Sequence, residues 1–133
     1  MELTSRVLAL SCFLLLVTGC ADKIPRAELL RRIEAGEAPS IVDVRSRSEY
    51  EAAHVPGAVH LPFYAVLSRS EAIPGGSEGE EPLVVYCEHG PRAGIARAQL
   101  WFAVDRPVRF MEGHMTAWKR DGLPVANDPE AEP

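Results

Sequence analysis

The chain has 133 residues, a formal net charge of -5 and three cysteines. One small domain is expected, because domains typically hold about 100–150 residues. With 25% charged and 47% hydrophobic residues, the composition is that of a globular protein rather than a disordered one. The acidic balance argues against a nucleic-acid surface, which needs clustered lysine and arginine.

The first feature along the chain is an apolar run over residues 7–17, which follows Arg6 and ends at small residues. A transmembrane helix needs roughly 20 apolar residues, so this run is too short to span a bilayer in that way. Its layout predicts a secretory signal peptide over residues 1–19. Conventional cleavage near Ala21 and an uncleaved N-terminal helix are the alternatives.

The end of this run, Val17-Thr18-Gly19-Cys20, resembles the lipobox of bacterial lipoproteins. The resemblance implies lipid attachment at Cys20, a lipid-anchored linker over residues 20–23, and a location in the bacterial cell envelope, facing the periplasm. Several acyl chains would anchor the protein stably, whereas a single chain binds a membrane only marginally. Because Ala21 rather than Asp follows the cysteine, resemblance to enterobacterial sorting favours the outer membrane over the inner one.

Helices and strands alternate along the rest of the chain. A helix is predicted over residues 27–36 and a β-branched strand over 41–45; a helix over 46–53 with Ser46 or Ser48 as N-cap, a turn over 54–57 and a strand over 58–61 follow. Next come one or two helical turns over 63–70, a mobile loop over 68–82, a strand over 83–87, a helix over 90–104, a strand over 108–111 and a helix over 114–120.

This alternation predicts an α/β domain over residues 24–126, built on a parallel sheet that helices cover on both faces. Residues 127–133 are expected to form a disordered tail. Removal of the signal peptide and lipidation of Cys20 would leave the domain a single thiol, Cys87.

Cys87 stands at the carboxyl end of a predicted strand, where open α/β sheets bind ligands. The segment that follows turns into a helix, so its backbone N–H groups and the helix dipole favour an anion such as a thiolate. Gly90 permits an unusual backbone turn, Pro91 suits the first helical turn, and Arg92 adds a positive charge. A buried cysteine that merely ends a core strand is the alternative.

Residues 87–92, Cys-Glu-His-Gly-Pro-Arg, resemble the Cys-x-x-Gly-x-Arg loop of single-domain rhodanese-like sulfurtransferases. Other landmarks of that family occur in order: the segment 41–50, the turn 54–58, and the closing segments 113–118 and 122–125. The resemblance covers about residues 24–126. It implies the rhodanese-like fold, a five-stranded, mostly parallel sheet with helices on both faces.

The resemblance also implies an activity: transfer of sulfane sulfur from a donor such as thiosulfate to a thiol or cyanide acceptor. Cys87 would carry the sulfur as a persulfide, with no cofactor. Backbone amides of the loop and the Arg92 side chain would bind the substrate, so the implied substrate-binding residues are Glu88, His89, Gly90, Pro91 and Arg92.

Two departures from the family pattern bear on this expectation. Glu88 places a negative charge in the loop, which would partly offset Arg92 and favour a donor other than thiosulfate. His114 replaces the second glycine of the family's closing pair, which is costly if that position needs a positive φ.

Three other functions compete with sulfur transfer. Related phosphatases and arsenate reductases have a loop one residue longer, which holds a tetrahedral oxyanion, so the shorter loop disfavours them. A weakly catalytic sulfur-carrier or adaptor module for a protein partner is a second alternative. A redox-sensing thiol at Cys87 is a third, although the domain offers no second cysteine to resolve it.

The remaining polar and aromatic residues are expected to be structural. Asp43 would accept backbone donors, and Arg45 and Glu49 have the spacing of a helical ion pair. Trp101 and Trp118 are expected to pack in the core, and His54 to hydrogen-bond in its turn. No cysteine or histidine pair has zinc-ligand spacing, so no metal is expected. No nucleic acid partner is expected either, and the domain should be a monomer.

Overall fold

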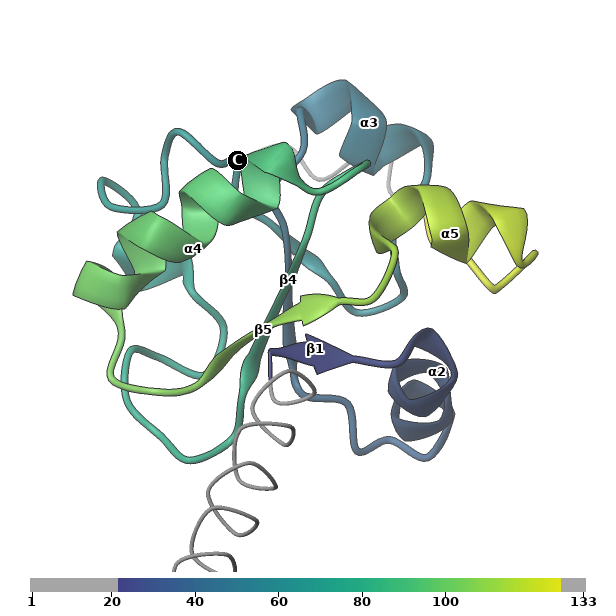
Figure 1. Cartoon of the computed structure of the whole chain (residues 1–133), viewed down its shortest axis with the longest axis horizontal. Helices are drawn as coiled ribbons and strands as arrows, with labels where there is room; N and C mark the ends of the chain where they lie inside the picture. Colours follow the sequence, from purple (N-terminus) through teal and green to yellow (C-terminus); the bar gives the residue numbers. More distant parts are fainter. Residues whose placement is uncertain (1–21, 128–133) are drawn as a thin grey trace, which may run out of the picture.

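The computed structural model of the chain describes residues 22–127 (Figure 1). The predicted signal peptide, Cys20, its linker before residue 22 and the tail beyond residue 127 lie outside the described residues. Among residues 22–127, no helix combines the length and apolar character that a membrane span requires.

The core of the fold is one sheet of five strands, all of them parallel to their neighbours. Across the sheet the order is β1-β5-β4-β2-β3, so β4 occupies the centre. The strands are β1 (Lys23–Ile24), β2 (Ser40–Asp43), β3 (Val59–His60), β4 (Leu83–Tyr86) and β5 (Val108–Met111). The predicted five-stranded α/β fold is confirmed, with a sheet that is entirely parallel.

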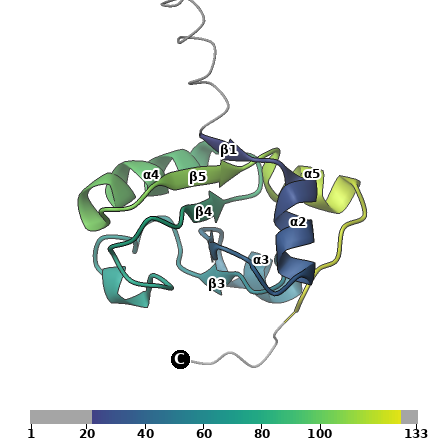
Figure 2. The ribbon, with the colours of Figure 1, turned by 90° about the horizontal axis from the view of Figure 1, so that it is seen from below.

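Helices cover both faces of this sheet (Figures 1 and 2). One face packs against α2 (Arg26–Glu34) and α5 (His114–Arg120), which contribute Leu29, Met115 and Trp118 to the core. The opposite face packs against α4 (Pro91–Ala103) and the buried residues between Leu61 and Ile73. Helix α3 (Arg47–Ala52) follows β2, with Ser46 as its N-cap.

The central strand shows why the sheet is two-sided. All four residues of β4 are fully buried. Leu83 and Val85 belong to the core under α4, whereas Val84 and Tyr86 belong to the core under α2 and α5. Such uninterrupted apolar strands are typical of parallel sheets, because both faces are covered. Cys87 continues the alternation and lies in the core under α4.

The segment between β3 and β4 differs from the sequence expectation. Residues 63–69 form turns rather than a helix, because their polar groups have other partners: Phe63 N–H donates to Val44, and the Gln99 side chain binds both Phe63 and Leu67. Within the predicted loop 68–82, Ser70–Ala72 forms a 3-10 helix and Ile73 is buried. Strand β1 has only two residues and was not predicted.

Candidate active site

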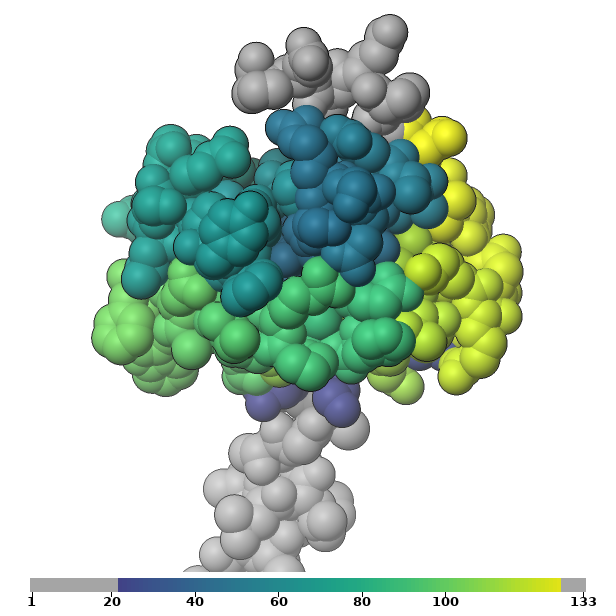
Figure 3. Space-filling model, turned by 90° about the horizontal axis from the view of Figure 1, so that it is seen from above, coloured from purple at the N-terminus to yellow at the C-terminus, as the bar shows by residue number. Residues whose placement is uncertain are grey.

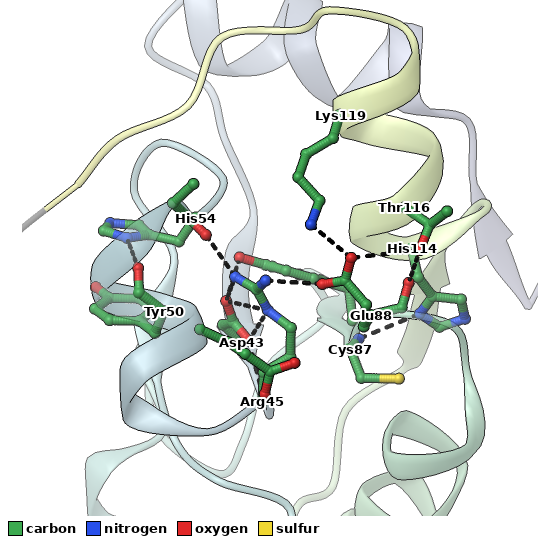
Figure 4. Close-up of polar contacts among 12 residues, drawn as sticks. Asp43, Arg45, Tyr50, His54, Cys87, Glu88, His114, Thr116 and Lys119 are labelled. Atoms are coloured by element: carbon green, nitrogen blue, oxygen red, sulfur yellow. Dashed lines mark hydrogen bonds and ion pairs between the residues drawn. The ribbon is translucent and has the colours of Figure 1, made fainter.

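Cys87 directly follows β4, at the carboxyl edge of the sheet, where the predicted site lies (Figure 4). Its side chain is 1% exposed. The Gly90 backbone N–H donates a hydrogen bond to the Cys87 sulfur at 2.9 Å. The segment 87–90 therefore curls around the sulfur before α4 begins.

Gly90 makes this curl sterically accessible. It is the N-cap of α4, with φ 130° and ψ -41°, a conformation that residues with a Cβ rarely adopt. Pro91 then occupies the first turn of α4, where its missing N–H costs no hydrogen bond. The positive end of the 13-residue helix consequently faces the loop that holds the sulfur.

Helix α5 orients the peptide groups of the loop from the other side. Met115 N–H donates to the Cys87 carbonyl at 3.0 Å, and Thr116 N–H donates to the Glu88 carbonyl at 3.1 Å. The Thr116 hydroxyl donates to the same Glu88 carbonyl at 2.8 Å. In a trans peptide the C=O and N–H groups point in opposite directions, so the N–H groups of Glu88 and His89 point away from α5. They are therefore free of α5 and able to stabilise an anion.

His114 also touches the loop. The Cys87 N–H donates to its Nδ1 at 3.2 Å, so this nitrogen is the unprotonated acceptor. Burial, with a smaller contribution from Lys23, lowers the pKa of His114 below 6.5. Its φ of 54° is the one positive φ at a non-glycine position in residues 22–127. The sequence raised the cost of such a backbone at position 114 but did not reveal that the ring reaches Cys87.

Arg92 forms a bidentate ion pair with Glu49 of α3, at 2.7 and 2.9 Å. Glu49 also completes the capping box of α3 by accepting from the Ser46 N–H and hydroxyl. The hydrogen bonds from Arg92 hold the pKa of Glu49 far below its usual range. The expected pairing of Arg45 with Glu49 is wrong: Glu49 turns toward α4, and Arg45 is bound elsewhere.

Arg45 belongs to a buried polar network beside the loop (Figure 4). It binds the fully buried Asp43 at 2.7 Å, the Ala53 carbonyl at 2.6 Å and the Glu88 carboxylate at 3.0 Å. Burial opposes the charge of Arg45, but the hydrogen bonds and the proximity of Asp43 outweigh it and raise its pKa. Asp43 also accepts the Arg45 N–H, as the sequence predicted for its backbone donors.

The Glu88 side chain is therefore not aimed at the sulfur. Its carboxylate lies on the α5 side of the loop, where Lys119 pairs with it at 2.6 Å and Arg45 at 3.0 Å (Figure 4). Burial would raise the pKa of Glu88, but hydrogen bonds from Lys119 and Arg45 outweigh it and lower the pKa. Glu88 thus pairs with Lys119 and Arg45 rather than with Arg92, and its effect on the choice of donor stays a prediction.

Sequence reasoning missed three partners of this network. Lys119 and Thr116 bind Glu88, and the Tyr86 hydroxyl donates to Asp43 at 2.7 Å while accepting the Val55 N–H. Burial beside Asp43 raises the pKa of Tyr86, so the phenol stays protonated. No local pattern pointed to these residues, since they lie many positions away in sequence from their partners.

The other predicted structural residues divide between confirmation and correction. His54 is buried and its Nδ1 lies 2.8 Å from the Tyr50 carbonyl, consistent with a hydrogen-bonding role. Trp118 is buried, but the expectation for Trp101 is wrong, since it is 80% exposed on α4. His89 lies 3.0 Å from the Thr116 hydroxyl. Within residues 22–127, no three histidine, cysteine or carboxylate side chains are grouped as metal ligands would be.

Comparison with known proteins follows this geometry. The family model described as "Rhodanese-like domain" matches residues 25–121. A protein named HTH-type transcriptional regulator from Mycobacterium tuberculosis is 40% identical over 106 residues, which cover 78% of this chain. The chain spans only 44% of that relative's length. A protein named sulfurtransferase from Allochromatium vinosum is 30% identical over 104 residues, covering 78% of this chain and 94% of the relative.

Among solved structures, the Rhodanese-like domain of an Anabaena protein is similar to this chain. The two superpose with a TM-score of 0.68 at 26% sequence identity. The match covers 84% of this chain and 83% of the other. The likeness thus supports the overall fold described above.

Proposed function

The chain belongs to the rhodanese-like domain family, and we propose from this membership that it is a sulfurtransferase that carries sulfane sulfur as a persulfide on Cys87. The observation that carries the proposal is the position of Cys87: it ends the central strand and its sulfur accepts the Gly90 N–H at 2.9 Å. The relative named sulfurtransferase supports it, because this chain spans 94% of that protein.

The proposed reaction is a double displacement. The Cys87 thiolate attacks the outer sulfur of thiosulfate, a new S–S bond forms, and the old S–S bond breaks as sulfite leaves with the electron pair. An acceptor such as cyanide or a thiolate then attacks the outer sulfur of the persulfide. The second S–S bond breaks, the acceptor leaves with the sulfur, and the Cys87 thiolate is regenerated without any external oxidant or reductant.

The loop supplies the electrostatics of both steps. The Gly90 N–H already faces the sulfur, and the Glu88 and His89 N–H groups point away from α5. Such preorganised donors stabilise negative charge on the persulfide without rearranging. Pro91 starts α4 without an N–H of its own, so the persulfide depends on the amides before and after it.

Arg92 is proposed to attract the anionic donor. Its guanidinium is held in place by both oxygens of Glu49, and these hydrogen bonds raise the pKa of Arg92 and keep it charged. Asp43, Arg45 and Glu49 are proposed to be structural, since each acts through another residue. Only four residues separate Cys87 from Arg92, a short ring that suits a sulfur atom better than a tetrahedral oxyanion.

Peptide-level mass spectrometry tests the proposal. After incubation with thiosulfate, the wild-type peptide that contains Cys87 should gain one sulfur, about 32 Da, and lose it to cyanide as thiocyanate. Peptide mapping keeps Cys12 and Cys20 apart from Cys87. The Cys87→Ser variant is the matched control and should gain nothing. No sulfur on Cys87 from thiosulfate or from a persulfide donor would contradict the proposal.

A sulfur-carrier or adaptor role is the second candidate. Cys87 is 1% exposed, which favours a protected persulfide over rapid turnover, and one relative of similar sequence is named as a transcriptional regulator. The expected sign is a stable Cys87 persulfide with negligible turnover on small acceptors. A redox-sensing thiol would instead be marked by rapid oxidation of Cys87 by mild peroxide.

The proposed location is the periplasmic side of a bacterial membrane, reached through a lipid on Cys20. Its support is the Val17-Thr18-Gly19-Cys20 sequence after a short apolar run. Cleavage before Cys20 and a mass gain of acyl chains on that residue are the expected signs. A mature protein that begins elsewhere would contradict it.

A further inference from the structure

His114 is the one non-glycine residue with a positive φ among residues 22–127, at 54°. A left-handed backbone is unfavourable for residues with a Cβ, and it persists where the surroundings enforce it. His114 begins α5, the helix whose N–H groups bind the carbonyls of Cys87 and Glu88. The strained residue therefore lies at the contact between α5 and the sulfur-carrying loop.

Two contacts join the ring of His114 to that loop. Its Nδ1 accepts the Cys87 N–H at 3.2 Å. Its Nε2 lies on the side of Gly90, 3.3 Å from the point where a Cβ on Gly90 would stand. The ring thus touches the loop on both sides of Glu88 and His89, and Phe110 packs near it with ring centroids 5.9 Å apart.

We propose that His114 is a positioning residue for sulfur transfer: its neutral ring fixes the Cys87 amide, and protonation of Nδ1 releases it. The proposal rests on the proposed function of Cys87 and adds a proton-dependent support for the loop. An imidazolium has no free lone pair, so the Cys87 N–H would lose its acceptor. The loop would then lose one of the contacts that fix its position against α5.

The groups around His114 also favour the neutral ring. Lys23 on β1 repels a positive charge there, and burial adds to this effect. Arg26 of α2 lies beside Gly113 and is paired with Asp121. From the loop come Glu88, which is already paired with Arg45 and Lys119, His89, which lies against Thr116, and the Cys87 thiol. None of the negative charges among these groups is left for an imidazolium at position 114.

An NMR titration of His114 and of the Cys87 amide tests the proposal without any sulfur transfer. The full chain in detergent micelles, labelled with 15N at its four histidines and three cysteines, reports ring tautomers and cysteine amides directly. Near neutral pH, His114 should carry its proton on Nε2. As pH falls, the Cys87 amide signal should shift with the same midpoint as the His114 ring. An Nδ1-protonated ring, or a Cys87 amide that ignores the ring, would overturn the proposal.

His114→Asn is the matched variant. Asparagine tolerates a positive φ and offers an oxygen acceptor, but it does not titrate. In this variant the Cys87 amide should lose the acid step. His60→Asn, which changes a histidine of β3 outside the loop, should keep it.

The functional arm compares pH profiles of sulfur loading. Between about pH 7 and pH 5, the fold decrease in the rate of sulfur loading should be roughly three times larger in wild type than in His114→Asn. Identical profiles in the two proteins would refute the positioning role. If wild type accepts no sulfur from any donor, the proposed function fails, while the NMR titration still decides whether His114 holds the Cys87 amide.

Discussion

At the scale of single residues, the sulfur of Cys87 accepts a hydrogen bond from the backbone rather than from a side chain. Gly90 donates its N–H to the sulfur, and α5 fixes the neighbouring carbonyls. Backbone donors need little reorganisation when charge develops, which suits the proposed alternation of Cys87 between thiolate and persulfide. Two side chains are proposed to act on the sulfur indirectly. Arg92 acts through its charge, and His114 acts through the Cys87 amide.

Replacement of Arg92 by lysine tests how much the fixed position of the Arg92 guanidinium contributes to donor binding. Lysine keeps the charge but cannot bind both oxygens of Glu49 in the same plane. Because the pair is about a third exposed, stability should fall by less than about 1 kcal/mol. The KM for thiosulfate should rise by roughly fivefold, about 1 kcal/mol, measured by steady-state formation of thiocyanate.

Arg97→Lys is the control for this change. Arg97 lies on the same helix, is equally exposed at 31% against 30%, and pairs with Asp22 rather than with a residue of the site. Its KM should equal that of wild type. Equal KM values for the two lysine variants would rule out a role for the fixed guanidinium of Arg92 in donor binding.

His114 also predicts a pH dependence of stability. Its pKa is lowered in the folded protein, mainly by burial, so the unfolded chain binds more protons over the range between the two pKa values. The free energy of unfolding should therefore fall as pH drops below about 6.5, the unfolded value, until the folded pKa is reached. Urea titrations should show wild type losing about 0.5–1 kcal/mol more than His114→Asn between about pH 7.5 and 5.5. Equal losses would contradict the assignment.

At the scale of elements, five segments meet at the site. The polar network links the end of β2 through Asp43 and Arg45 to the loop after β4 through Glu88, and to α5 through Lys119. Helix α3 joins α4 through Glu49 and Arg92. Three ion pairs thus hold the short segment 87–92 in place relative to the sheet: two on Glu88 and one on Arg92.

Asp43→Asn should show how much the buried part of this network contributes. Asp43 accepts hydrogen bonds from the Arg45 side chain and the Tyr86 hydroxyl, and its loss of charge leaves a buried guanidinium with Glu88 as its remaining carboxylate. Breaking a buried pair in this way typically costs about 3–5 kcal/mol, which urea denaturation would measure. Glu81→Gln, which breaks the exposed pair with Arg32, should cost under about 1 kcal/mol. Similar costs for both variants would mean that the network does not stabilise the fold.

The sequence predicted elements whose signal is local and continuous. Strand Val108–Met111 and helix His114–Arg120 have the expected bounds, since the pattern that predicts each lies within a few consecutive residues. The sequence did not reveal the ion pairs whose partners are distant along the chain. Glu49 pairs with Arg92 rather than with Arg45, and Glu88 pairs with Lys119. Trp101 was misplaced because helical spacing alone does not reveal how much of α4 the sheet covers.

At the scale of the whole molecule, the sulfur-carrying loop follows the central strand β4, whereas the described chain begins beside the edge strand β1. Cys87 follows the carboxyl end of β4, whereas Asp22 precedes β1 and pairs with Arg97 of α4. Strand β1 is the edge strand of the sheet (Figure 1), and Figure 3 shows the purple start of the described chain at the lower side of the domain, next to green residues. Lys23 of β1 pairs with Phe110 of β5, which in turn pairs with Val85 of β4. An anchor attached before β1 would thus join the domain at the edge of the sheet, two strands away from the strand that Cys87 follows.

Cys20→Ser tests this arrangement in the full chain. Loss of the acylated cysteine should move the protein from the membrane fraction to the soluble fraction, because a protein without acyl chains has only weak affinity for a bilayer. The rate of Cys87 sulfur loading should stay within about twofold of wild type in detergent, since residue 20 precedes the rhodanese-like domain matched over residues 25–121. Cell fractionation and peptide-level mass spectrometry would measure both. Membrane association that survives the substitution would contradict the lipid anchor, whereas a large loss of sulfur loading would show that the anchor and the loop are coupled.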